Sequence, residues 1–244
     1  MFHPPAIFAK KNPDIKGLTE KKDIYGLIRA LNSPDLEVHT AAAKALGTLG
    51  PEAVDDLAKE VRATAMLIGP GLWREHETFQ AILQIIEQTD LPMVIDADAI
   101  RAVGTQPVVL AQKKAVLTPH SDEFRALTGN TPSQDVKERS EKVKLAANEL
   151  GVIILLKGAV DIISDGDFVA LNRTHTNLMT KGGMGDTLAG ICGALLARGV
   201  EPYTAAQAAA YINGKAGLLA AKEFGEGMIP KDLIERIPKV IKGK

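Results

Sequence analysis

The stretch MTKGGMGDTLAG, residues 179–190, places three glycines and an aspartate before an apolar run. The glycines predict a turn without side chains, and the next residues predict a helix that begins with Asp186, Thr187 and Leu188. The unpaired amides of a helix start and its positive dipole end form a site for an anion such as phosphate. Asp186 would then lie beside a phosphoryl group in transfer, where it could accept a hydroxyl proton. The alternative is that Asp186 only caps the helix and the glycines only form a loop.

Two further groups of polar residues follow apolar runs. Lys157 and Gly158 end the run GVIILLKG, where an ammonium group and a bare amide could hold nucleotide phosphates. A lone lysine at a strand end is more often only solvated. His120 and Glu123 follow VLTP at a spacing that lets both face one crevice. Glu123 also suits the first turn of a helix, where the dipole favours a carboxylate.

Glycines and aspartates follow the remaining apolar runs. In GPGL, Gly69 and Gly71 would let the backbone approach a ligand closely, or would simply form a tight turn. In DADAI, Asp96 and Asp98 could bind a metal or a hydroxyl group, or cap the next helix. We expect capping for one of these two aspartates.

Strands and helices must bring these polar residues to one edge of a sheet. Short apolar runs predict strands over residues 64–69, 92–96, 114–118 and 151–158, and DIISD and FVALN predict a hairpin around Gly166. Helices are predicted over residues 77–88, 133–150, 186–198, 203–224 and 230–236. This alternation indicates an α/β fold, a mainly parallel sheet with helices on both faces. Ligands of such sheets bind beyond the carboxyl ends of the strands.

The amino-terminal part has a different character. Prolines indicate an extended or frayed lead over residues 1–12. Two helical stripes follow, over residues 24–31 and 38–49, and a third helix is expected over residues 51–62. The pattern is typical of one HEAT-type repeat, but a helical hairpin packed on the main domain explains it equally well.

Composition limits the class of protein. The chain has 244 residues, 45% of them hydrophobic, which suits one large globular domain with a small addition. We expect residues 1–50 to form the helical lead and residues 51–244 the nucleotide-binding catalytic domain. A net charge of −1 argues against nucleic acid as a partner, and no segment suits a signal peptide or a membrane span. The single cysteine, Cys192, is expected to be a packed, reduced thiol in a cytoplasmic protein rather than a reactive one. A homo-oligomer is compatible with these features.

Together, the motifs resemble the ribokinase-like ADP- or ATP-dependent NAD(P)H-hydrate dehydratases. The similarity covers residues 52–240 and rests on LIGPGL, PMVIDADAI, VLTPHSDEFRALTG, LLKGAVDIISDGD, LNRT and GGMGDTLAGICGALLARG, in the family's order. It implies an enzyme that repairs hydrated NADH or NADPH: a nucleotide phosphorylates the added hydroxyl group, and phosphate then leaves. It also implies ADP or ATP and Mg²⁺ as cofactors.

The resemblance further implies roles for individual residues. Asp186 would bind the hydrate and act as the base, and Gly71 and His120 would line the same substrate site. The nucleotide would be held by Lys157, Gly158, Ala159, Val160, Asp161 and Gly185. Glu123 would lie near the phosphates and the magnesium ion.

The chain departs from the family pattern in two places. Before GPGL, the proline-containing lead and the HEAT-like helices replace the family's usual first strands and part of its substrate wall. Near the glycine turn, residues 175–178 replace a glycine-containing segment, and Met184 replaces a small hydroxyl residue. Two alternatives to an active dehydratase therefore stay open: a non-catalytic or truncated remnant with a vestigial nucleotide site, and another ribokinase-like small-molecule kinase.

Overall fold

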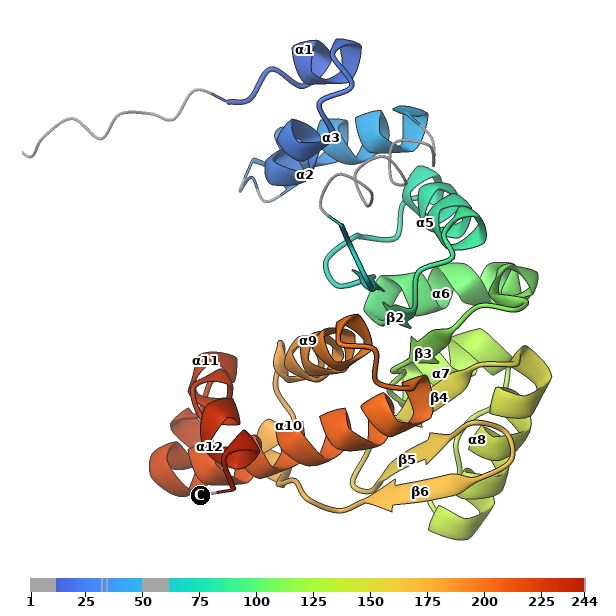
Figure 1. The fold of residues 1–244 in the computed structure, drawn as a ribbon, viewed down its shortest axis with the longest axis vertical. Helices are drawn as coiled ribbons and strands as arrows, with labels where there is room; N and C mark the ends of the chain where they lie inside the picture. Colours follow the sequence, from blue (N-terminus) through green and yellow to red (C-terminus); the bar gives the residue numbers. More distant parts are fainter. Residues whose placement is uncertain (1–11, 32, 34, 50–61, 244) are drawn as a thin grey trace, which may run out of the picture. The chain divides into compact units, whose positions relative to one another are not determined.

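The chain divides into two compact units, residues 1–61 and 62–244. The computed structural model describes residues 12–31, 33, 35–49 and 62–243. In the first unit, these include three helices, α1 (Ile15–Glu20), α2 (Ile24–Leu31) and α3 (Leu36–Leu49) (Figure 1). They pack on one another through small buried residues such as Ala30 and Ala42. The two predicted helical stripes are therefore confirmed.

Other predictions for this part differ or lie outside the described residues. The helix α1 was not predicted; Asp14 caps it by accepting a hydrogen bond from the Gly17 amide at 3.0 Å. The lead before Asn12, the boundary between residues 50 and 51, and the expected third helix before Arg62 lie outside the described residues. The HEAT-type repeat stays a prediction.

The second unit is built on a six-stranded sheet in the order β1-β2-β3-β4-β5-β6. Parallel pairing joins β1 (Met66–Ile68), β2 (Met93–Ile95), β3 (Ala115–Leu117) and β4 (Ile153–Leu156). The antiparallel strands β5 (Asp161–Ser164) and β6 (Val169–Asn172) complete it as the predicted hairpin. The predicted mainly parallel sheet is confirmed.

Helices cover both faces of this sheet, as predicted (Figure 1). One face carries α5 (His76–Gln88), α6 (Ala97–Thr105), α7 (Ser121–Thr128) and α8 (Val136–Leu150). The other carries α9 (Met184–Ala197) and α10 (Pro202–Phe224). Two short helices, α11 (Pro230–Ile234) and α12 (Ile237–Ile241), pack on α10. Short 3-10 turns cover Pro107–Leu110, Asn177–Met179 and Gly225–Gly227.

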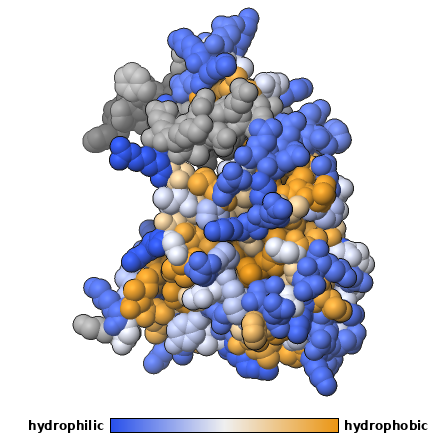
Figure 2. Space-filling model, turned by 45° about the vertical axis from the view of Figure 1, so that its right-hand side comes forward, coloured by the Kyte–Doolittle hydropathy of each residue, from blue (hydrophilic) through white to orange (hydrophobic). Residues whose placement is uncertain are grey.

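The central strands β2, β3 and β4 are apolar throughout because both of their faces are buried. Met93 and Ile95 of β2 belong to the core under α5 to α8, whereas Val94 between them belongs to the core under α9 and α10. Side chains of a strand alternate between faces, so a continuously apolar strand fits only a doubly covered sheet. On the surface shown in Figure 2, hydrophilic and hydrophobic residues are interspersed. Within the described ranges, every helix is too short or too polar to cross a bilayer.

Helix ends differ from the prediction where caps and prolines set them. The helix α8 begins at Val136 rather than residue 133, because Asp135 caps it by accepting a hydrogen bond from the Glu138 amide at 2.8 Å. The helix α9 begins at Met184, two residues before the predicted Asp186. The predicted helix over residues 230–236 ends at Ile234, and α12, which carries a proline in its first turn, follows it.

The position of Cys192 predicts its reactivity. The thiol is fully buried between α9 and the sheet, which confirms the packed cysteine, and burial raises its pKa to about 12. Because the thiolate is the reactive form, we expect no labelling of the native protein by Ellman's reagent at mildly alkaline pH. The same protein unfolded in guanidinium should react with one equivalent. Native labelling as fast as that of the unfolded chain would contradict the buried position.

Candidate active site

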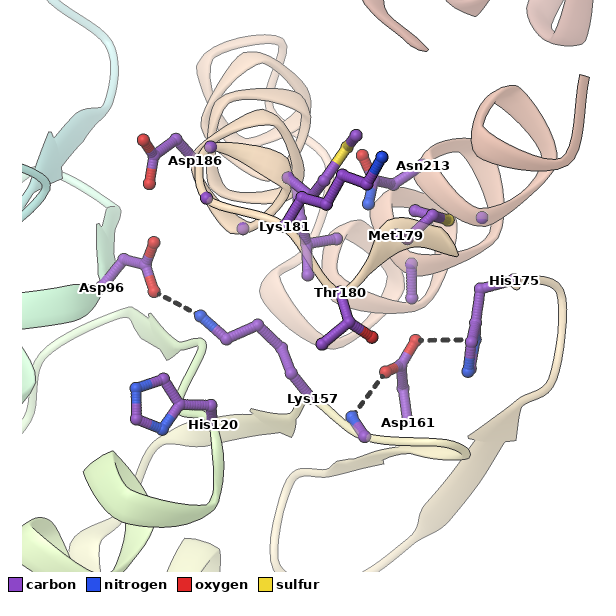
Figure 3. Close-up of a pocket in the computed structure, with 18 of the residues that line it drawn as sticks. Asp96, His120, Lys157, Asp161, His175, Met179, Thr180, Lys181, Asp186 and Asn213 are labelled. Atoms are coloured by element: carbon purple, nitrogen blue, oxygen red, sulfur yellow. Dashed lines mark hydrogen bonds and ion pairs between the residues drawn. The ribbon is translucent and has the colours of Figure 1, made fainter. Parts of the chain in front are cut away.

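A cavity of about 560 Å³ lies at the carboxyl edge of the sheet (Figure 3). Residues that follow β2, β3 and β4 line it, together with the start of α9 and part of α10. Most of the predicted site residues meet here: His120, Glu123, Lys157, Gly158, Asp161, Gly185 and Asp186. They come together because the carboxyl ends of parallel strands share one edge.

Three predicted site residues do not line this cavity. Gly71 lies on the surface in the turn after β1, with a φ of 73°. Ala159 is exposed in the turn between β4 and β5. Val160 is buried, and its carbonyl accepts a hydrogen bond from Arg139 Nη2 at 2.9 Å. The ligand roles of these three residues stay predictions.

Lys157 is the central side chain of the cavity. Its backbone is fixed by the hydrogen bond that its N–H donates to the Pro119 carbonyl at 2.8 Å. Its Nζ lies 2.9 Å from Asp96 Oδ1 and 3.7 Å from Glu123 Oε2. A methyl group built on Gly185 would lie 3.3 Å from the same Nζ. An anion at this point would therefore meet both an ammonium group and the start of α9.

His120 and Glu123 form a capping box at the start of α7. His120 Nδ1 accepts hydrogen bonds from the amides of Asp122 and Glu123 at 3.1 and 3.3 Å, and Glu123 Oε2 accepts one from the His120 N–H at 2.8 Å. His120 Nε2 lies 3.1 Å from Glu123 Oε1. With Nδ1 as an acceptor, the neutral ring carries its proton on Nε2. Both expectations for Glu123 are confirmed: it supports the helix start and faces the same crevice as His120.

Asp161 begins β5 and fixes the loop that follows Lys157. One carboxylate oxygen accepts a hydrogen bond from the Gly158 amide at 3.1 Å, and the other accepts one from Asn172 Nδ2 at 2.9 Å. His175 Nδ1 lies 3.8 Å from the second oxygen. Burial raises the pKa of Asp161, while these hydrogen bonds and the charges of His175 and Lys157 partly oppose that rise.

The glycine-rich turn leads directly into α9. Gly183 has a φ of 85°, in the left-handed region that favours glycine, and it precedes the first helical residue Met184. Gly185 and Asp186 are thus the second and third residues of α9, in the turn whose amides have no acceptor within the helix. Asp186 is exposed, and its carboxylate forms no hydrogen bond or ion pair with another described residue. Its carboxylate is free to receive a proton from a ligand in the cavity.

The capping expected of Asp96 or Asp98 is wrong. Asp96 occupies the position before α6, but its side chain makes no capping hydrogen bond. It instead accepts hydrogen bonds from Thr118 Oγ1 at 2.8 Å and from Lys157 Nζ at 2.9 Å. Asp98 pairs with Arg74 at 2.9 Å. Pairing of β2 with β3 brings Thr118 to Asp96, and no local pattern in the sequence signals that contact.

Several polar residues of the site were not predicted. Thr118 and Asn172 orient Asp96 and Asp161, respectively. Asn213 lines the cavity from α10, and its buried Oδ1 has no hydrogen-bond partner among the described residues. An asparagine within an alanine-rich helical run was the available signal for Asn213. The contact of Asn172 depends on the register of the predicted hairpin, and that of Thr118 depends on the pairing of β2 with β3, which no local pattern signals.

The donor groups of the cavity fit a metal ion that arrives with a phosphate ligand. No group of three or more His, Cys, Asp or Glu side chains among the described residues could hold a metal by itself. Yet the cavity is lined by more carboxylates than lysines: Asp96, Glu123, Asp161 and Asp186 against Lys157 and Lys181. Mg²⁺ commonly binds one or two carboxylates together with phosphates and water. An anionic ligand would therefore enter this cavity more readily with a divalent cation.

A mainly parallel sheet, with a strand-end lysine and a glycine-rich helix start at its carboxyl edge, defines a ribokinase-like α/β protein. A ribokinase-like superfamily protein from Enterococcus faecalis has the same fold, with a TM-score of 0.65 and 26% identity over 86% of this chain and 75% of that chain. The chain belongs to the NAD(P)H-hydrate dehydratase family, whose profile matches residues 25–239. The match begins within α2, so the family profile includes most of α2 and all of α3 in the first unit.

Named relatives agree with this assignment. The bifunctional NAD(P)H-hydrate repair enzyme Nnr of Hyperthermus butylicus is 45% identical over 186 residues, 74% of this chain and 35% of that protein. The ADP-dependent (S)-NAD(P)H-hydrate dehydratase of Cenarchaeum symbiosum is 39% identical over 175 residues, 72% of this chain and 61% of that protein. This chain thus spans less than two thirds of the length of either relative.

A solved structure of the family has the same fold. The ADP/ATP-dependent NAD(P)H-hydrate dehydratase of Bacillus subtilis, co-crystallized with ATP and Mg²⁺, has a TM-score of 0.63 and 26% identity. The similarity covers 82% of this chain and 83% of the Bacillus subtilis chain.

The raised pKa of Asp161 predicts a pH-dependent stability. A carboxyl group with a higher pKa in the folded chain contributes stability that is fully present below the unfolded pKa and is lost as the pH rises through the folded pKa. We expect the free energy of unfolding of the wild type, relative to Asp161→Asn, to fall as the pH rises across this range. Urea denaturation at a series of pH values measures it. Asp167→Asn, which removes an exposed carboxylate from the turn between β5 and β6, is the control. If the free energy of unfolding of the wild type, relative to Asp161→Asn, rose with pH, the raised pKa would be contradicted.

Proposed function

We propose that this chain uses ADP or ATP to phosphorylate the hydroxyl group of hydrated NADH or NADPH, after which phosphate leaves and the reduced dinucleotide is restored. The names of the relatives from Cenarchaeum symbiosum and Bacillus subtilis support this activity and these nucleotides. The observation that carries the proposal is the position of Lys157, Gly185 and Asp186 around one cavity. Together they supply an ammonium group, bare amides and a free carboxylate.

The nucleotide would bind along the loop after β4 and the start of α9. Lys157 and the amides of Gly185 and Asp186 would hold the phosphates, because they offer positive charge and unpaired N–H donors at one point. The loop from Gly158 to Asp161 would support the rest of the nucleotide. Asp161 stiffens this loop through the hydrogen bond that it accepts from the Gly158 amide.

Asp186 would act as the base. As the substrate hydroxyl oxygen forms its bond to the terminal phosphorus, the bond from that phosphorus to the nucleotide breaks and the hydroxyl proton passes to Asp186. The carbon–oxygen bond then breaks with phosphate as the leaving group, and loss of a proton from the adjacent ring carbon restores the double bond. Phosphorylation matters because phosphate leaves far more readily than hydroxide.

His120 and Gly71 are proposed to contact the hydrate. The Nε2 proton of neutral His120 is available to a substrate oxygen when it is not directed at Glu123 Oε1. Glu123, whose Oε2 lies 3.7 Å from Lys157 Nζ, is the proposed ligand of the magnesium ion. When bound, that ion neutralises charge on the phosphoryl group.

The two alternative functions receive less support. Lys157, His120 and Asp186 all line the cavity, whereas loss of function usually leaves such polar residues free to change. A hydroxyethylthiazole kinase from Pyrococcus horikoshii has a TM-score of 0.63 but only 22% identity, so it supports the fold alone. We also infer a cytoplasmic protein, because the only cysteine of the chain is a buried thiol without a disulfide.

Recovery of NADH absorbance tests the proposed reaction. Purified chain incubated with hydrated NADH, Mg²⁺ and ADP or ATP should restore the absorbance. Asp186→Ala should lower kcat by about 10²- to 10⁴-fold, because the base is lost, while ADP still binds. Circular dichroism and a thermal melt establish that the variant is folded. A folded wild type that binds ADP without restoring NADH would favour the vestigial site, and consumption of nucleotide only with a vitamin alcohol would favour another kinase.

Gly185→Ala tests the phosphate position. The added methyl group would lie 3.3 Å from Lys157 Nζ, in the space where a phosphate is expected. We expect ADP affinity to fall by about tenfold, a cost of about 1.4 kcal/mol, whereas stability should hold because alanine favours the helix. Calorimetric titration with ADP measures the affinity. Gly190→Ala is the matched control, since its methyl group on the same helix would meet no atom within 4 Å. Equal affinities of both variants would contradict the proposed position.

A further inference from the structure

Asp96 is a buried carboxylate of the cavity that the proposed reaction does not use. Its exposed fraction is 1%. Its N–H donates to the Ile68 carbonyl at 3.0 Å, and its Oδ1 accepts hydrogen bonds from Thr118 Oγ1 at 2.8 Å and from Lys157 Nζ at 2.9 Å. The end of β1 thus holds the backbone of Asp96, and the residues that follow β3 and β4 hold its carboxylate.

Burial gives the contact between Asp96 and Lys157 its importance. A carboxylate removed from water is stable only when it is paired and hydrogen-bonded. Among the described residues, Lys157 is the cation that contacts Asp96, and the lysine side chain is itself only 20% exposed. The buried carboxylate of Asp96 has a fixed position, and it attracts the ammonium group at the end of the longer, more flexible lysine side chain.

The direction of Lys157 depends on which carboxylate holds it. Asp96 Oδ1 is 2.9 Å from Nζ, whereas Glu123 Oε2 is 3.7 Å away and also accepts a hydrogen bond from the His120 amide. Figure 3 shows Lys157 extending from the end of β4 toward Asp96. In this view, Asp186 lies above Asp96, and His120 lies below the lysine side chain. Without the charge of Asp96, Glu123 is the remaining carboxylate partner. The ammonium group would then move toward α7 and away from Gly185.

We propose that Asp96 is a positioning residue, which holds the ammonium group of Lys157 beside the start of α9 so that the two together bind a nucleoside diphosphate. The inference deepens the proposed function and rests on it for the identity of the ligand. Asp96 acts through Lys157 and is not itself required to touch the substrate.

Calorimetric titrations with ADP in the presence of EDTA test this role. Four proteins are compared: wild type, Asp96→Asn, Lys157→Met and the double variant. In the wild-type background, Asp96→Asn should weaken ADP binding by about tenfold, because Lys157 loses its direction. In the Lys157→Met background, the same substitution should tighten binding, because it removes an unpaired negative charge next to the phosphates. EDTA excludes any effect of Asp96 on a bound divalent ion.

The change of sign separates positioning from a structural role. Weakening by the same factor in both backgrounds would show that Asp96 merely supports the fold and would overturn the inference. Tighter binding by Asp96→Asn in the wild-type background, or no ADP binding by the wild type either in EDTA or with Mg²⁺, would overturn it as well. If the wild type binds ADP only with Mg²⁺, the four proteins are compared with Mg²⁺ and the change of sign is judged in the same way. A change of sign without NADH recovery from the hydrate would refute the dehydratase activity and leave the role of Asp96 intact.

Two further variants control the experiment. Asp98→Asn removes a carboxylate two residues away that pairs with Arg74 outside the cavity, and ADP affinity should not change. Thr118→Val removes the hydroxyl group that orients Asp96, and it should reproduce the effect of Asp96→Asn in weaker form. Asparagine at position 96 keeps an oxygen to accept the Thr118 hydroxyl, so the fold should persist. If it does not, Thr118→Val replaces it in the comparison: it should weaken ADP binding in the wild-type background and leave it unchanged in the Lys157→Met background, where Asp96 has no lysine to hold.

Discussion

The site depends on burying negative charge at the carboxyl edge of a parallel sheet. Asp96 and Glu123 are 1% and 6% exposed, and Lys157 reaches both. Buried carboxylates are tolerated only with hydrogen bonds and a counter-charge, so the three side chains fix one another. The backbone fixes them further, because β2, β3 and β4 are hydrogen-bonded neighbours whose ends arrive together. These three side chains therefore form the fixed part of the cavity.

A second constraint comes from the opposite side of the cavity. The helix α9 packs on the sheet through its buried face, including Leu188 and Cys192, and this packing holds its first turn over the strand ends. Gly185 leaves no side chain between that turn and Lys157. The ammonium group and the unpaired amides can therefore act on the same anion. Replacement of glycine by any larger residue would separate them.

The third part of the cavity is formed by close packing of α10 on the loop after β6. A methyl group built on Gly214 would lie 1.7 Å from the Thr174 carbonyl, so only glycine permits this approach. The loop brings His175 beside Asp161, and α10 places Asn213 at the cavity wall. Gly214 of α10 thus allows the approach that shapes this part of the cavity.

Periodicity and apolar runs were sufficient to predict the parallel sheet, its two helical layers and the glycine turn, because these features follow from local residue patterns. They also identified Lys157, His120 and Asp186, since polar residues that follow apolar strands lie at the edge where ligands bind. Only the tertiary structure decided that Asp96 pairs with Lys157 instead of capping α6, and that Asn172 holds Asp161. Those partners are set by strand register and by the cost of burying charge. Asp96 and Lys157 come from segments far apart in the chain, whereas Asp161 and Asn172 face each other across one hairpin whose register the sequence pattern left open.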